Sequence, residues 1–109
     1  MADGSINMGL VVAGQLAATD TDVYAPSVPS TNVVVELLNT HTADEVVTLY
    51  KRISSGTHFI VFQRTLAANG GSACYVAGDM GSTTKLSGKS TGATRVNCLV
   101  SAREYTAPS

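Results

Sequence analysis

The chain has 109 residues and a formal net charge of −1, and only 14% of its residues are charged. That length fits one domain with a single core, stable without metals or disulfides. Ser and Thr together number 24 while Glu, Lys and Arg are few, so the composition favours strands over helices and excludes the strongly basic surface of most nucleic-acid-binding domains.

Short apolar runs with a period of two recur along the whole chain and predict strands. In chain order, the stronger strands are expected within Ile6 to Val12, Val33 to Leu37, Val47 to Leu49, Thr57 to Arg64 and Val96 to Ala102. Weaker ones are expected at Asp22 to Ala25, Ser72 to Ala77 and Thr83 to Ser87. Pro26 and Pro29 confine Ala25 to Ser30 to an edge or a connection, because proline cannot donate to a ladder.

No window of the sequence keeps helical spacing, so little or no helix is expected. The pattern predicts an all-β fold, an antiparallel β-sandwich of jelly-roll type with about eight short strands. The side chains expected to face its core are Val33, Val35, Leu37, Val47, Leu49, Val96, Cys98 and Val100.

Two parts are distinguished along the chain: residues 1–13 as an N-terminal arm or first strand, and residues 14–109 as a single β-sandwich domain. Within the first part, apolar side chains alternate at Ile6, Met8, Leu10 and Val12. Either this stripe contacts a neighbouring molecule by strand addition, or it is the first strand of the chain's own sandwich. We therefore take these four residues as candidate assembly contacts.

Charge is distributed unevenly along the sequence. Residues 1–50 contain six acidic residues and no Lys or Arg, and all seven basic residues follow from Lys51 onward. Two surfaces of opposite sign would suit self-association. Alternatively, interleaved strands mix the two halves in space and remove the asymmetry.

No motif supports catalysis or a cofactor. The segment Ser87-Gly88-Lys89-Ser90 ends like a phosphate-binding loop, but the leading glycine of that motif is replaced by Thr83, so a solvated loop is expected. The group Ser54, Ser55 and His58 lacks a nucleophile elbow. We expect a protein that is not an enzyme and has no catalytic residue and no cofactor.

Metal and nucleic-acid sites are equally unsupported. The possible zinc ligands are far apart in the sequence: His41, His58, Cys74 and Cys98. Asp20-Thr21-Asp22 begins like a calcium loop, without the glycine and the distal glutamate of that loop. Tyr50-Lys51-Arg52 is a single basic triplet. No metal site and no nucleic-acid partner are therefore expected.

The start Met-Ala-Asp-Gly has no secretion signal, and no apolar run is long enough for a membrane span. We expect synthesis in the cytoplasm without a signal peptide and no membrane partner. Both cysteines are then expected as reduced, buried residues without a disulfide.

Several ordered segments carry a resemblance to a known family. They are Gly14-Gln15-Leu16, Val23 to Pro26, Leu38-Asn39-Thr40, Val46 to Tyr50, Leu66 to Gly70, Lys85 to Gly88 and Glu104-Tyr105. This strand-and-turn pattern resembles small tailed-bacteriophage virion β-sandwich proteins of the capsid cement or decoration type.

The resemblance implies a non-enzymatic structural protein on the capsid surface of a virion, made in the host cytoplasm. Its partners would be the major capsid protein and itself, as a homotrimer, and it would stabilise neighbouring capsomers. The alternatives are a tail, baseplate or head-fibre component of the same fold and, in another class, a carbohydrate-binding module.

Overall fold

The structure, a computed structural model, describes residues 5–53 and 57–106, and within them every regular element is a strand. The eight strands are β1 Ser5–Gln15, β2 Thr21–Tyr24, β3 Ser30–Asn39, β4 Glu45–Ile53, β5 Thr57–Leu66, β6 Ser72–Met80, β7 Thr84–Ser90 and β8 Val96–Thr106. Each one overlaps a stretch that the period-two pattern predicts.

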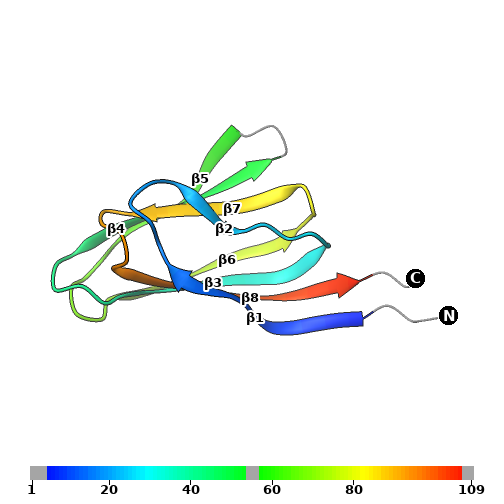
Figure 1. Ribbon diagram of the computed structural model, residues 1–109, viewed down its shortest axis with the longest axis horizontal. Helices are drawn as coiled ribbons and strands as arrows, with labels where there is room; N and C mark the ends of the chain where they lie inside the picture. Colours follow the sequence, from blue (N-terminus) through cyan, green and yellow to red (C-terminus); the bar gives the residue numbers. More distant parts are fainter. Residues whose placement is uncertain (1–4, 54–56, 107–109) are drawn as a thin grey trace.

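The strands form two four-stranded antiparallel sheets that pack face to face (Figure 1). The first sheet has the order β1-β8-β3-β6 and the second the order β2-β7-β4-β5. The predicted all-β sandwich is therefore confirmed. The proline-containing segment after β2 is a connection, as expected, since β3 begins only at Ser30.

The core lies between the two sheets, where alternate side chains of each strand meet. Val33, Val35 and Leu37 of β3 face Val47 and Leu49 of β4 across it. All eight side chains that the sequence predicts to face inward are buried: Val33, Val35, Leu37, Val47, Leu49, Val96, Cys98 and Val100.

The segment that resembles a phosphate-binding loop is not the expected solvated loop. Ser87 to Ser90 lies in β7, between β2 and β4 in the second sheet. Gly88 is buried there, and a Cβ atom at this position would lie 2.7 Å from Leu49 Cδ2. The glycine thus permits close packing inside a sheet, and its backbone is committed to strand pairing rather than to an anion.

The acidic first half and the basic second half of the sequence are mixed in space. This agrees with the explanation that interleaved strands remove the charge asymmetry. Asp22 on β2 pairs with Arg52 on β4, with an Nη2 to Oδ1 distance of 3.0 Å. Glu45 pairs with Arg95, with an Nη1 to Oε2 distance of 3.4 Å. Interleaving the strands therefore places early acidic residues beside later basic ones.

Each of the three long edge strands contains one extra residue that interrupts its ladder. The register shifts leave Val11 of β1, Val61 of β5 and Ala77 of β6 without a partner in the neighbouring strand. Bulges of this kind increase local twist and oppose edge-to-edge pairing over the full length of a strand. This leaves the outer faces of the sheets as the larger continuous surfaces for contact.

Candidate functional site

The four predicted assembly contacts all lie in β1, which pairs with β8. This strand continues to Gln15, past residue 13, which the sequence predicts as the end of the N-terminal arm. Ile6 and Met8 pair with Tyr105 and Arg103, and their side chains lie outside the described part of the structure. Leu10 pairs with Ser101 and is exposed, whereas Val12 pairs with buried Val100 and packs against the core. The bulge at Val11 therefore directs Leu10 outward and Val12 inward. The apolar stripe seen in the sequence thus does not lie on a single face of β1.

The outer face of the first sheet is unusually apolar for a solvent-facing surface. Cross-strand pairing places Leu10, Ser101, Val34 and Val76 in one row across the sheet. The next row along the strands is Ala13, Leu99, Glu36 and Cys74, and the one after it is Gln15, Asn97, Leu38 and Ser72. Contiguous exposed apolar surface of this kind marks interaction sites on soluble proteins.

Part of this face is hollowed into a groove of about 450 Å³. We call it the outer-face groove, and the outward side chains that line it are Glu36, Leu38, Ser72, Cys74, Asn97 and Leu99. The hollow exists because β6 carries small residues here, while Leu38 and Leu99 rise beside them. Gln15 Nε2 donates to Asn97 Oδ1 at 3.1 Å, which fixes one side of the groove.

The two cysteines differ in environment, which corrects the expectation that both are buried. Cys74 is exposed in the groove, because it lies on the outer face of β6. Cys98 is buried in the core, and desolvation raises the pKa of its thiol to about 11. The two thiols lie on opposite faces of the first sheet, and both are free.

A second uncovered apolar surface lies at the end of the β4–β5 hairpin. We call it the hairpin tip and define it by Ile53 and Phe59 on one face of the hairpin and Ile60 on the other, all exposed. The rings of Phe62 on β5 and Tyr75 on β6 pack with centroids 5.6 Å apart and close the side of the sandwich. Beyond that contact, the hairpin stands away from the first sheet in Figure 1.

The polar residues of the hairpin tie its outer face to the rest of the second sheet. His58 bonds to Asp20, and its ring contacts that of Tyr50 edge to face at 5.9 Å. On the opposite face, Lys51 Nζ donates to the Ala77 carbonyl of β6 at 3.0 Å. Phe59 is the cross-strand partner of Lys51, so it lies on the same face but beyond the region that the first sheet covers.

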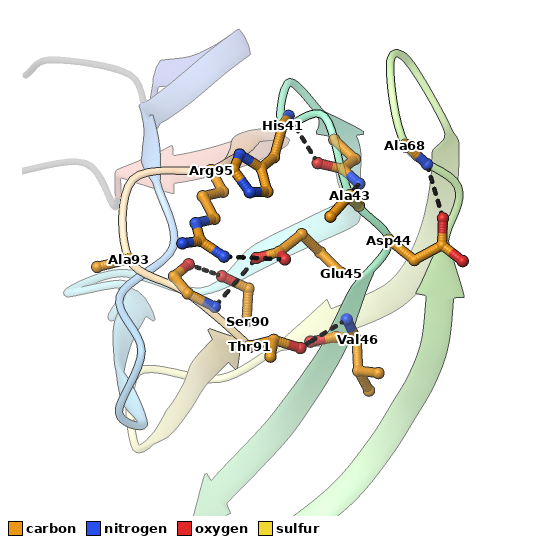
Figure 2. A network of polar contacts seen from close by, with 12 residues as sticks. His41, Ala43, Asp44, Glu45, Val46, Ala68, Ser90, Thr91, Ala93 and Arg95 are labelled. Carbon is orange, nitrogen blue, oxygen red and sulfur yellow. Dashed lines mark hydrogen bonds and ion pairs between the residues drawn. The ribbon is translucent and has the colours of Figure 1, made fainter.

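Figure 2 shows a polar cluster at the opposite end of the sandwich that sequence reasoning missed. Buried Glu45 accepts a hydrogen bond from the Gly92 amide at 3.0 Å and pairs with Arg95. Buried Asn39 donates to the carbonyls of Ala43 and Leu66. These side chains hold together the loops that follow β3, β5 and β7, and so they fix the end of the molecule that carries the groove.

The candidate chemical residues that the structure describes are not gathered into a site. No group of His, Cys, Asp or Glu able to hold a metal ion is found among the residues that the structure describes. His41 lies in the turn after β3 and His58 in β5, while Ser54 and Ser55 lie outside the described residues. Asp20 is engaged with His58, and Asp22 with Arg52 and Lys85.

No described segment forms a helix of the length and apolarity needed to cross a membrane.

Comparison with known proteins gives a likeness of fold. No protein-family profile and no curated protein matches the sequence. A solved structure of Bacillus endospore appendages, described as a novel family of disulfide-linked pili, superposes with a TM-score of 0.57 and 20% identity. The match covers 98% of this chain and 93% of that chain. At this identity it supports the β-sandwich fold and carries no residue roles.

The expectation of a phage capsid cement or decoration protein is wrong. A solved structure with a similar fold is a bacterial endospore appendage and not a virion component. The segments that carried the resemblance are strand ends and turns, such as Leu38-Asn39-Thr40 and Val46 to Tyr50. A sandwich needs such segments whatever it assembles into, so they specify a fold and not a particular assembly.

Proposed function

We propose that this protein is a non-enzymatic structural subunit that associates with copies of itself into an extended, appendage-like polymer. The assembly surface in this proposal is the outer face of the first sheet, with its groove. Open-ended self-association takes the place of the homotrimer that the phage resemblance implied.

The apolar outer face of the first sheet carries the proposal. In an antiparallel sheet with one solvated face, polar residues alternate with core residues. In β3, by contrast, apolar Val34 and Leu38 occupy outward positions where polar residues would be expected. Their neighbours Val33, Val35 and Leu37 are buried in the core. On β6, Val76 is 67% exposed. Strands that are apolar on both faces are typical of sheets covered on both sides, so a second molecule is the expected cover.

Three further points agree with this role. The bulges in β1, β5 and β6 oppose pairing along whole edges, which favours contact through a face. The proteins of the solved structure with a similar fold are pili, that is, polymers of subunits. A small sandwich that buries little core of its own also gains stability from association.

The proposal is tested by following the size of the purified chain as its concentration rises, with sedimentation and negative-stain electron microscopy. We expect particles that lengthen with concentration. Val76→Asp should shift assembly to at least tenfold higher concentration, roughly the effect of one unfavourable contact of 1.4 kcal/mol. Val46→Asp is the matched control, since Val46 is also exposed but lies in the second sheet. A monomer of one size at every concentration would contradict the proposal.

A further inference from the structure

The two uncovered apolar surfaces are separated by about the length of β4. The groove residues of β3 directly precede Asn39, where that strand ends and the chain turns toward the start of β4 at Glu45. From there β4 runs away from the groove end and reaches the tip at Ile53, a span of about 26 Å at 3.3 Å per residue. One molecule therefore cannot bring its own tip to its own groove.

The sizes of the two surfaces match. A cavity of about 150 Å³ accommodates a benzene ring. The groove, at about 450 Å³, therefore has room for the ring of Phe59 together with Ile53 beside it. Leu38 and Leu99 would then contact an aromatic ring, the type of side chain most enriched at the centre of protein interfaces.

The charges are also complementary. Glu36 stands in the groove between Leu99 and Cys74, and no ion pair joins it to any described residue. Lys51, the cross-strand partner of Phe59, donates to a neutral carbonyl. Like Glu36, it forms no ion pair with any described residue. Docking the tip would bring this cation toward the groove carboxylate, and opposite charges attract across an interface.

We infer that the hairpin tip of one copy docks into the outer-face groove of the next copy, an inference that rests on the proposed function. The contact joins two different surfaces, so it is heterologous. Each docked copy leaves one free tip and one free groove, so the contact propagates as an open chain wherever the rotation between copies does not close a ring.

The test uses two variants of the full chain, each of which disables one surface. Phe59→Asp disables the tip, and Leu38→Asp disables the groove. Both side chains are exposed, at 53% and 41%, so the fold should persist, which circular dichroism and thermal melting check. Each variant alone should require at least roughly thirtyfold higher concentration to assemble, the loss expected for a central interface residue.

An equimolar mixture of the two variants gives the decisive result. It contains one intact tip and one intact groove, so it should form a 1:1 heterodimer that does not grow further. The control variant Val46→Asp should assemble like the wild type, because Val46 is similarly exposed, at 42%, but lies outside both surfaces. If Leu38→Asp fails to fold, Glu36→Lys replaces it as the groove variant.

A second measurement reports on the groove directly. Alkylation of Cys74 by iodoacetamide should slow at least tenfold in the wild-type polymer relative to the monomeric Phe59→Asp variant. Wild-type assembly with both variants unaffected, a mixture that stays monomeric, or unchanged alkylation would each overturn the docking of tip into groove. A wild-type chain that never assembles would overturn the proposed function itself.

Discussion

At the scale of single residues, a few buried polar groups organise this protein. Tyr24, which is 5% exposed, bonds through its hydroxyl to Ser30 Oγ at 2.8 Å and donates to Glu104 Oε2 at 2.5 Å. This links β2 of the second sheet to β3 and β8 of the first. Burial of the phenol and, to a smaller extent, its bond to the Glu104 carboxylate raise the pKa of Tyr24 to about 12.

Stability should therefore fall at alkaline pH. A tyrosine whose pKa is higher when folded keeps its proton in the folded state and loses it in the unfolded state between about pH 10 and 12, so unfolding becomes easier across that window. Full ionisation should remove on the order of 2 kcal/mol. In urea titrations, Tyr24→Phe should be less stable than the wild type at pH 7 and should lose less stability above pH 10.

Exposed Tyr105 provides the matched control, since Tyr105→Phe should leave both the stability at pH 7 and its alkaline decline unchanged. An alkaline decline in Tyr24→Phe equal to that of the wild type would show that another group is responsible. Cys98, whose pKa is raised to about 11, is the next candidate, and its contribution has the same sign.

At the scale of elements, the pairing of β1 bears on the two explanations of the N-terminal arm. It pairs with β8 along its length, and Val11 and Val12 pack against the core. Its removal would leave β8 as an edge strand and expose one side of the core. The pairing thus favours the first strand of the chain's own sandwich, with exposed Leu10 contributing to the outer face.

Deleting residues 1–12 should therefore destabilise the domain, by on the order of 3 kcal/mol for two partly buried valines and their strand pairs. Against a total stability of about 5–15 kcal/mol this loss is readily measured by urea unfolding. Deleting residues 1–4, which precede β1, is the control. A protein lacking residues 1–12 that unfolds like the wild type but no longer assembles would assign the arm to assembly instead.

At the scale of the whole molecule, the fold is elongated, with extents of 54 × 28 × 18 Å. The hairpin tip projects from the side of this elongated molecule, away from the end at which β3 finishes (Figure 1). Covalent linkage is limited by the cysteines: the chain has two, of which Cys98 is buried and Cys74 exposed. One accessible thiol per subunit can join two chains but cannot extend a covalent polymer.

Oxidation of the chain below the concentration at which it assembles should therefore give a band at two subunits, and none higher, on a non-reducing denaturing gel. Cys74→Ser should abolish this band, whereas Cys98→Ala should retain it, because a buried thiol with a raised pKa forms little thiolate. A ladder of larger covalent species would mean that Cys98 becomes accessible during assembly. In this respect the chain should differ from the disulfide-linked pili that share its fold.

The sequence alone determined the sandwich, the positions of the strands and the inward-facing residues, because a period of two and turn residues act locally along the chain. It did not determine that Glu45 and Asn39 would be buried, that β7 would pass through Ser87 to Ser90, or that Leu10 and Val12 would face opposite ways. Those outcomes depend on which strands become neighbours and where a bulge shifts their register.

The candidate site shows the same division. The consecutive apolar residues Val33 to Val35 and Phe59 to Phe62 were visible in the sequence and could have indicated strands that are apolar on both faces. Only the tertiary structure decided which of these faces another sheet covers. Pairing β3 with β6 and β8 brought Leu38, Cys74 and Leu99 into one groove, from segments up to 61 residues apart, because contacts between distant segments follow from topology rather than from local pattern.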